Sequence, residues 1–166
     1  MSADDLRRAI TRIAHEIVER NHGLDDVVLL GLQRGGVGIA RRLSEVLADV
    51  ENRVVPVGVI DAGAHRDDRE PSAVARTATD VPVDLSEKVV VLVDDVLFTG
   101  RTIRAALNAL NDHGRARAVQ LAVVVDRGHR ELPIRPDFVG KNLPTSRAEQ
   151  VRVELEEGVT IGELLP

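Results

Sequence analysis

Apolar residues recur at a helical spacing near the start of the chain. Between Asp4 and Asn21 an apolar side chain returns every third or fourth position, which predicts an amphipathic helix lying on a core. The apolar positions are Leu6, Ile10, Ile13 and Ile17. On the other face Arg8, Arg12 and His15 fall at i, i+4 and i+7, so these basic side chains project together toward solvent or a partner.

Farther along, the apolar residues come in short continuous runs. Runs rich in Val and Leu and bounded by polar residues or glycine predict strands that are buried on both faces, here at residues 27–30, 89–93 and 119–125. Helices are expected at about residues 37–50 and 100–111, an edge strand at 54–60, which Pro56 interrupts, and short strands near 138 and 151–155. This alternation is typical of a mostly parallel α/β sheet flanked by helices.

Composition narrows the class of protein. The 166 residues are 43% hydrophobic and 30% charged, which fits a single globular domain over residues 1–166. The absence of cysteine excludes a disulfide framework, a thiol nucleophile and a cysteine-ligated metal. The sequence has neither a run of about eighteen apolar residues nor a secretory signal pattern, so we expect a cytoplasmic protein that does not span a membrane.

Charge and aromatic content restrict how the chain can meet nucleic acid. A net charge of −5 argues against diffuse, sequence-independent binding, although a local basic patch is compatible with it. The chain has two Phe and no Tyr or Trp, which nearly excludes RNA recognition by stacking bases on aromatic platforms. Contact with RNA would therefore depend on other side chains.

The segment from Asp94 to Thr102 carries the most informative chemistry. An apolar strand delivers Asp94 and Asp95 at its carboxyl end, where open α/β sheets bind their ligands. The free N–H groups at the following helix start favour a phosphate, Thr99 and Thr102 add hydroxyl donors, and Gly100 permits close approach of the backbone. The carboxylates suit neutral vicinal hydroxyls or a water-coordinated Mg²⁺. A ribose bearing a 5′-phosphate fits the whole segment.

A second glycine-rich turn, Gly31 to Gly36, also follows a buried strand and opens a helix. Its glycines allow backbone amides to turn toward an anion, and Arg34 can supply charge-assisted hydrogen bonds. A tight turn without a ligand is an equally good interpretation of this segment taken alone. The chain has no Walker phosphate loop, and Arg41 stands where a dinucleotide fingerprint would have its third glycine.

Two acidic residues followed by Thr-Gly-Arg-Thr, as in residues 94–102, resemble the phosphoribosyl pyrophosphate (PRPP) motif of type I phosphoribosyltransferases. From about Leu6 to Val153 the chain resembles the PyrR family, whose members are pyrimidine operon attenuation proteins and uracil phosphoribosyltransferases. The most specific stretches are DRGHRELPIR at residues 126–135 and GKNLPTS at 140–146. Supporting stretches lie at residues 11–17, 93–102 and 120–123.

The resemblance implies a type I phosphoribosyltransferase fold with a small hood, built from the N-terminal and C-terminal segments, and a mobile lid over about residues 61–87. It implies the Mg²⁺-dependent conversion of uracil and PRPP to UMP and pyrophosphate, and UMP-dependent binding of the mRNA leader hairpin of a pyrimidine operon, which attenuates transcription. A homodimer or homotetramer is also implied. Two alternatives stay open: an RNA-binding nucleotide sensor with little catalysis, and a phosphoribosyltransferase without RNA regulation.

Site residues follow from the same resemblance. Catalytic roles go to Asp94, Asp95 and Arg34, and the two carboxylates are expected to hold Mg²⁺ through water and PRPP. Binding of PRPP and UMP is assigned to Gln33, Arg34, Gly35, Arg66, Asp94, Asp95, Val96, Leu97, Phe98, Thr99, Gly100, Arg101 and Thr102. The base pocket is assigned to Arg127, Phe138 and Val139. RNA contact is assigned to Thr11, Arg12, His15, His129, Arg130, Arg135 and Lys141, for which a solvated basic face is the alternative.

Three sequence details modify the expectation. Purine-specific relatives carry an aspartate where this chain has Phe98, which does not titrate, so a pyrimidine substrate is favoured. The family usually reads Thr-Arg-Gly where this chain has Arg-Gly-Gly at residues 34–36, a loop that occurs in other phosphoribosyltransferases and favours retained PRPP binding. Residues 61–68 also depart from the family's lid. Their His65, Arg66, Asp67 and Asp68 are expected to close on pyrophosphate, for which a solvated charged loop is the alternative.

Overall fold

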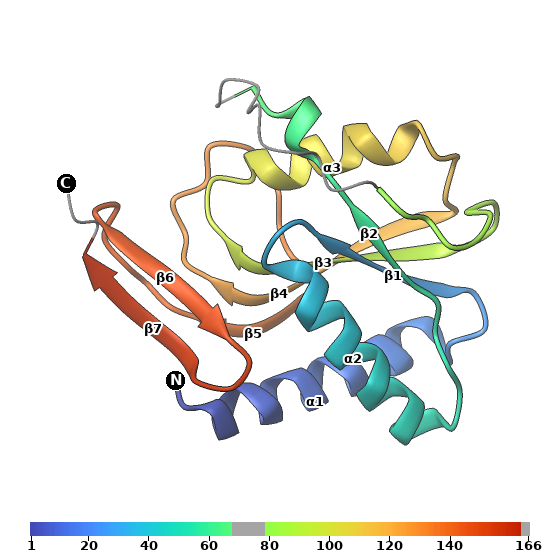
Figure 1. Ribbon diagram of the computed structural model, residues 1–166, viewed down its shortest axis with the longest axis horizontal. Helices are drawn as coiled ribbons and strands as arrows, with labels where there is room; N and C mark the ends of the chain where they lie inside the picture. Colours follow the sequence, from blue (N-terminus) through green and yellow to red (C-terminus); the bar gives the residue numbers. More distant parts are fainter. Residues whose placement is uncertain (68–78, 164–166) are drawn as a thin grey trace.

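The computed structural model describes residues 1–67 and 79–163. Its centre is a five-stranded parallel sheet with the strand order β2-β1-β3-β4-β5 (Figure 1). The strands are β1 (Val27–Leu32), β2 (Val57–Ile60), β3 (Val89–Leu97), β4 (Ala118–Asp126) and β5 (Phe138–Asn142). In β1 every residue is buried, because helices cover both faces of the sheet.

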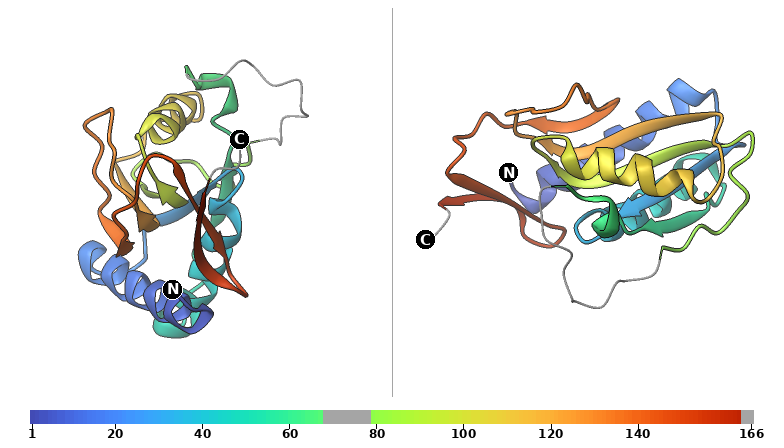
Figure 2. Two further views of the ribbon diagram at one scale, coloured as in Figure 1. Left: turned by 90° about the vertical axis from the view of Figure 1, so that its left-hand side faces the viewer. Right: turned by 90° about the horizontal axis from the view of Figure 1, so that it is seen from above.

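Helices pack on both faces of this sheet. One face is covered by α1 (Ala3–Asn21) and α2 (Gly36–Glu51), and the other by α3 (Arg101–Asn111) with the short helix η1 (Gly63–His65) (Figures 1 and 2). Two separate apolar cores result, because successive side chains of a strand point to opposite faces. Leu29 belongs to the core beneath α1 and α2, whereas Leu30 belongs to the core beneath α3.

The N-terminal helix has a well-defined start. The Ser2 hydroxyl accepts a hydrogen bond from the Asp5 backbone N–H, and the Asp5 carboxylate accepts one from the Ser2 backbone in return. This capping box satisfies two N–H groups that a helix start otherwise leaves without partners. The apolar face of α1, predicted from the spacing of Leu6, Ile10, Ile13 and Ile17, is buried against the sheet.

An antiparallel hairpin of β6 (Glu149–Glu154) and β7 (Gly158–Glu163) lies beyond the carboxyl ends of the parallel strands (Figure 1). The N-terminal residue joins it: the Met1 amino group donates to the Val159 carbonyl over 3.0 Å, and the Val159 N–H donates to the Met1 carbonyl over 2.8 Å. A Cβ on Gly158 would lie 2.3 Å from the Met1 carbonyl oxygen, so only glycine permits this approach.

The predicted strands and helices are confirmed, with shifted ends. The run at residues 89–93 continues as β3 to Leu97, so Asp94 and Asp95 belong to the strand itself. The predicted strand over residues 54–60 is shorter, since β2 begins after Pro56, and it lies at the sheet edge as expected. The middle of the expected lid, residues 68–78 with Asp68, lies outside the described residues. Across residues 1–67 and 79–163, no helix is both long and apolar enough to cross a membrane.

Candidate active site

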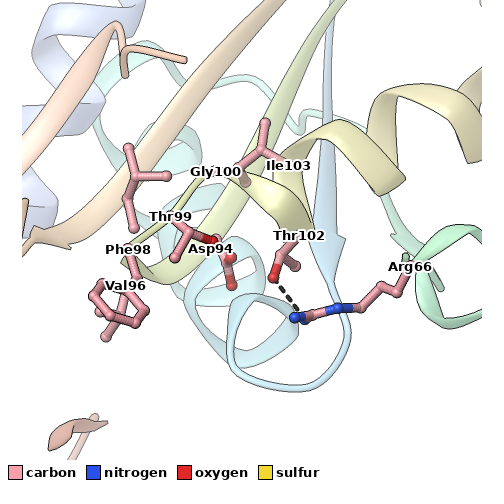
Figure 3. Close-up of a pocket in the computed structure, with 9 residues that line it drawn as sticks. Arg66, Asp94, Val96, Phe98, Thr99, Gly100, Thr102 and Ile103 are labelled. Carbon is pink, nitrogen blue, oxygen red and sulfur yellow. Dashed lines mark hydrogen bonds between the residues drawn. The ribbon is translucent and has the colours of Figure 1, made fainter. Parts of the chain in front are cut away.

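A cavity of about 250 Å³ opens at the carboxyl end of β3, as the sequence motif predicts. Figure 3 shows the residues around it, which come from the end of β3, the start of α3 and the segment after η1. They are Arg66, Asp94, Val96, Leu97, Phe98, Thr99, Gly100, Thr102 and Ile103. Eight of these nine were assigned to PRPP and UMP binding from the sequence, and Ile103 is the addition.

Asp94 is the acidic group that faces this cavity (Figure 3). Its side chain is buried, with 6% of the residue exposed, and its carboxylate accepts a 3.0 Å hydrogen bond from the Asp95 N–H. Burial, reinforced by the neighbouring Asp95 carboxylate, raises the pKa of Asp94 well above its usual value, while the Arg66 guanidinium acts in the opposite direction. A buried carboxyl group is therefore held at the ligand site at a cost in desolvation.

Asp95 has a different neighbour, the glycine loop after β1. A Cβ on Gly35 would lie 2.1 Å from an Asp95 carboxylate oxygen, and one on Gly36 would lie 2.0 Å from the Val93 carbonyl oxygen. The loop therefore rests directly on the end of β3, which only glycine permits. Gln33, whose peptide bond to Arg34 is cis, is half-buried, whereas Arg34 is exposed. The two motifs found in the sequence meet at this point.

The start of α3 forms a phosphate-sized cradle. Gly100 precedes the helix with φ 93°, a left-handed conformation that other residues rarely adopt. The first N–H groups of α3 form the positive end of the helix dipole, and the first of them, that of Arg101, points to the Thr99 hydroxyl oxygen. The Arg66 guanidinium donates a 2.7 Å hydrogen bond to the Thr102 hydroxyl, so a cationic side chain already stands at this cradle (Figure 3).

Phe98 and Arg127 form a wall next to the cavity. The Arg127 guanidinium carbon lies 4.1 Å from the Phe98 ring centroid, and the His129 ring meets the same ring edge-on at 5.8 Å. Arg127, 7% exposed, also donates to the Thr145 hydroxyl over 3.0 Å and to the Ser146 carbonyl over 2.7 Å. The loop after β5 is thereby fixed to this wall.

Comparison with known proteins identifies the family. The family model described as the phosphoribosyl transferase domain matches residues 2–157. A relative from Roseiflexus sp., named Bifunctional protein PyrR, is 59% identical over 160 residues, which cover 95% of this chain and 87% of the relative. The chain belongs to the PyrR family. A relative of the same name from Streptomyces coelicolor is 60% identical over 161 residues, covering 95% of this chain and 82% of its own length.

Solved structures agree on the fold of this PyrR family member. The crystal structure of the hypoxanthine phosphoribosyltransferase of Trypanosoma cruzi superposes with a TM-score of 0.75 at 19% sequence identity. The match covers 98% of this chain and 94% of that one. At this identity the likeness concerns the fold alone, and it confirms the type I phosphoribosyltransferase fold expected from the sequence.

Two residues assigned to the base pocket direct their side chains into the apolar cores. Phe138 begins β5 and is 3% exposed in the core beneath α1, so its place in the base pocket stays a prediction that concerns its backbone groups. Val139 packs against the core on the opposite face. The sequence interpretation missed Thr145 and Ser146, which the Arg127 side chain holds next to Phe98. Their only sequence signal is the GKNLPTS stretch.

Arg101 was also assigned to PRPP and UMP binding, but it is not among the residues that line the cavity, and its side chain pairs with two carboxylates. The Arg101 Nε donates to the Glu131 carboxylate over 2.7 Å, and its Nη1 donates to Asp67 over 2.9 Å. It thus joins the stem of the expected lid to the segment after β4. Its backbone N–H, at the start of α3, donates to the Thr99 hydroxyl oxygen over 3.3 Å.

The residues assigned to RNA contact fall into two groups. Thr11, His15, Arg135 and Lys141 are exposed. Arg12 is half-exposed, but its guanidinium donates to the Gly140 carbonyl over 2.6 Å and pairs with Glu16, which fixes α1 to β5. His129 and Arg130 are tied to neighbouring segments, His129 through a 2.5 Å contact between its Nε2 and the Thr145 carbonyl.

The donor set fits Mg²⁺. Asp94 and Asp95 present carboxylate oxygens side by side, and this ion prefers oxygen ligands and retains waters or substrate phosphates in its shell. Within residues 1–67 and 79–163 no group of three or more His, Asp or Glu is placed to enclose a metal. Two carboxylates together with the phosphates of a substrate would hold the ion in the way that phosphoryl-binding sites commonly do.

Proposed function

We propose that this chain is a uracil phosphoribosyltransferase that makes UMP and pyrophosphate from uracil and PRPP, and that it also regulates a pyrimidine operon by binding its mRNA leader. The observation that carries the enzymatic half is the cavity at the end of β3. The Asp94 carboxyl group lines this cavity together with Thr99, Gly100 and Thr102 at the start of α3. This combination of groups supports a ribose 5′-phosphate bound by its hydroxyls and its phosphate.

Each group has a defined role in the transfer. As pyrophosphate leaves C1′, positive charge develops on the ribose, and the Asp94 carboxyl group, which lines the cavity beside Asp95, is placed to stabilise it. Bound Mg²⁺ would neutralise charge on the leaving pyrophosphate. Arg34, exposed at the tip of the glycine loop, is placed to donate charge-assisted hydrogen bonds to the same group. The stem of the expected lid brings Arg66 to the cradle, where closure would exclude water.

Selectivity for a pyrimidine rests on Phe98 and Arg127. Phe98 offers no proton acceptor to a purine ring nitrogen, and the Arg127 guanidinium covers one face of its ring. The hydrogen bonds from Arg127 to residues 145–146 fix the loop after β5 beside the Phe98 ring. The lack of a proton acceptor at position 98 supports a pyrimidine base.

The enzymatic proposal predicts that the purified chain forms UMP and pyrophosphate from uracil, PRPP and Mg²⁺. Chelation of Mg²⁺ should abolish turnover, since the leaving group then lacks its counter-charge. Hypoxanthine in place of uracil is the matched control, because the fold is shared with hypoxanthine phosphoribosyltransferases. Chromatography of the products is the measurement. Conversion of hypoxanthine at a rate equal to that of uracil, or no UMP at all, contradicts the proposal.

The regulatory half rests on the exposed basic side chains and on membership of the PyrR family. We propose that Thr11, His15, Arg135 and Lys141 contact the leader hairpin in a UMP-dependent manner, in the cytoplasm and as a homodimer or homotetramer. Positively charged groups that contact phosphates position an RNA, and its unpaired bases supply the specificity. The net charge of −5 restricts such binding to a local surface.

The two lysines of the chain allow a direct test of this surface. Lys141 is exposed at the carboxyl end of β5, whereas Lys88 stands before β3 and pairs with Asp26. Lys141→Met is expected to weaken binding of the leader RNA about tenfold and to reduce its salt dependence by about one phosphate contact. Lys88→Met should bind like the wild type. Gel shifts with UMP at several salt concentrations measure both, and equal affinity of the two variants would remove Lys141 from the RNA surface.

A further inference from the structure

The segment at residues 127–134 is hydrogen-bonded along the phosphate loop, residues 97–102. The Leu97 carbonyl accepts a 3.1 Å hydrogen bond from the Arg127 N–H. The Thr99 carbonyl accepts two, over 2.9 Å from the Glu131 N–H and over 3.2 Å from the N–H of the next residue. No residue of 127–134 lines the cavity, whereas residues 96–100 do, so the phosphate loop stands between this segment and the ligand site.

The Phe98 carbonyl, which lies between those of Leu97 and Thr99 in the sequence, accepts a hydrogen bond from the Arg130 side chain. The Arg130 Nη1 donates to it over 2.9 Å, Nε donates to the Ile134 carbonyl over 2.8 Å, and Nη2 pairs with Asp126 at 2.5 Å. Although its side chain is 23% exposed, every nitrogen of the guanidinium therefore contacts a different residue. The Arg130 contact also lowers the pKa of Asp126, so this ion pair persists at neutral pH.

Peptide geometry makes the Phe98 carbonyl consequential. In a planar trans peptide the N–H points opposite to the C=O, so the N–H of Thr99 points away from Arg130, on the side of the loop that is not occupied by residues 127–134. A charged donor on the carbonyl polarises the peptide and strengthens its N–H as a donor to an anion. An anion bound by that N–H strengthens the bond to Arg130 in the same way.

We propose that Arg130 is a positioning residue that orients the peptide between Phe98 and Thr99 for the ribose phosphate and transmits occupancy of the site to residues 127–134. Arg135, which belongs to the proposed RNA surface, follows directly after this segment, so the same contact links the nucleotide to that surface. The inference rests on the proposed function. It also reassigns Arg130, which the sequence placed in direct contact with RNA, to a position beneath that surface.

Arg130→Met tests the proposal, because methionine keeps an unbranched apolar stem and removes every donor. Loss of a charge-assisted hydrogen bond to the loop is expected to raise the KM for PRPP about tenfold with a smaller effect on kcat. Arg115→Met is the control, since Arg115 is exposed between α3 and β4 at the amino end of the sheet. Hydrogen exchange with and without PRPP and Mg²⁺ supplies a readout that a general loss of stability would not reproduce.

In the wild type and in Arg115→Met, PRPP is expected to slow amide exchange in residues 128–135 as well as in the phosphate loop. In Arg130→Met the slowing should be confined to the phosphate loop. The proposal is overturned if PRPP slows amide exchange in residues 128–135 of Arg130→Met as much as in the wild type. It is also overturned if, in the wild type, PRPP slows exchange in the phosphate loop alone. Binding of PRPP without any UMP formation from uracil would instead contradict the proposed function.

Arg130→Lys covers the case in which the methionine variant does not fold. Its ammonium keeps the pair with Asp126 but presents one centre in place of a planar fork, so it cannot reach the carbonyls of Phe98 and Ile134 together. Its KM for PRPP should lie between those of Arg130→Met and the wild type. A wild-type KM and a wild-type exchange response in Arg130→Lys would show that the fork geometry is dispensable and would overturn the inference.

Discussion

Asp94→Asn is expected to lower the rate of UMP formation by about a hundredfold or more while raising the thermal stability of the protein. The loss of rate follows because an amide is uncharged: it cannot hold Mg²⁺ as a carboxylate does or stabilise positive charge on the ribose. The gain in stability follows because an amide carries no charge to desolvate in a position that is 6% exposed. For this one variant, the enzyme assay should therefore show a lower rate of UMP formation and calorimetry a higher Tm.

The pH dependence of this gain has a definite direction. The Asp94 pKa is raised above its ordinary value of 3.8, chiefly by burial, so the folded state binds a proton that the unfolded state releases. The wild type consequently loses stability as the pH rises from 3.8 through the raised pKa, and the loss is constant above it. The difference in Tm between Asp94→Asn and the wild type should be largest above the raised pKa and should vanish as the pH falls toward 3.8.

Asp84→Asn is a control with the opposite sign. The Ser86 backbone N–H and the Lys88 charge lower the pKa of Asp84. The ionised carboxylate therefore stabilises the fold at pH values above the ordinary pKa of 3.8, and this stabilisation is lost as the pH falls through the lowered pKa. Its substitution should lower Tm slightly at neutral pH and leave UMP formation unchanged.

Asp95→Asn should lower UMP formation as well, since Asp95 stands at the glycine loop. A fully active Asp94→Asn enzyme would remove Asp94 from the catalytic role.

The sequence predicts the parallel sheet well because its information is local. Strands that are buried on both faces appear in the sequence as continuous apolar runs, and the runs in β3 and β4 are sufficient to identify these strands. The hairpin strand β7 was missed for the opposite reason. Only its first two residues, Gly158 and Val159, are buried, so its sequence shows no apolar run or clear alternation. Its hydrogen-bond partners, β6 and Met1, can be identified only from the folded structure.

The site divides in the same way between local and distant contacts. Asp94, Thr99 and Thr102 belong to one strand, turn and helix, so their spacing in the sequence already fixes their arrangement. The base side depends on contacts between segments about twenty residues apart, such as Arg127 with Thr145. Proximity to a motif was the only guide there, and it could not show that the side chain of Phe138 lies in the core.

Charged residues are the least predictable part, because a basic residue in a sequence does not reveal its partner. Arg12, Arg101 and Arg130 were all expected to contact a ligand or RNA. In the structure each guanidinium donates to backbone carbonyls or carboxylates of neighbouring segments. Lys141, by contrast, remains exposed. Substitution of the three arginines therefore disturbs the arrangement of segments as well as any ligand contact.

Gly36→Ala and Gly38→Ala, two residues apart at the start of α2, are expected to have opposite effects on stability. A Cβ on Gly36 would lie 2.0 Å from the Val93 carbonyl oxygen, which belongs to the backbone of β3 and cannot move away cheaply. Overpacking of this kind costs about 1–3 kcal/mol. A Cβ on Gly38 would meet only the end of the Leu155 side chain, at 3.6 Å, so alanine should stabilise the helix by about 0.5–1 kcal/mol.

The same clash connects the fold to catalysis. To relieve it, the start of α2 must move off the end of β3 and take the glycine loop with it, which separates Gly35 from the Asp95 carboxylate. Gly36→Ala should therefore lose most UMP formation even under conditions in which it remains folded, whereas Gly38→Ala should keep it. Urea denaturation and the enzyme assay measure the two effects separately. If Gly36→Ala unfolds at the urea concentration of the wild type and remains active, the glycine loop does not rest on β3 as described, because a loop in this position leaves no room for a methyl group.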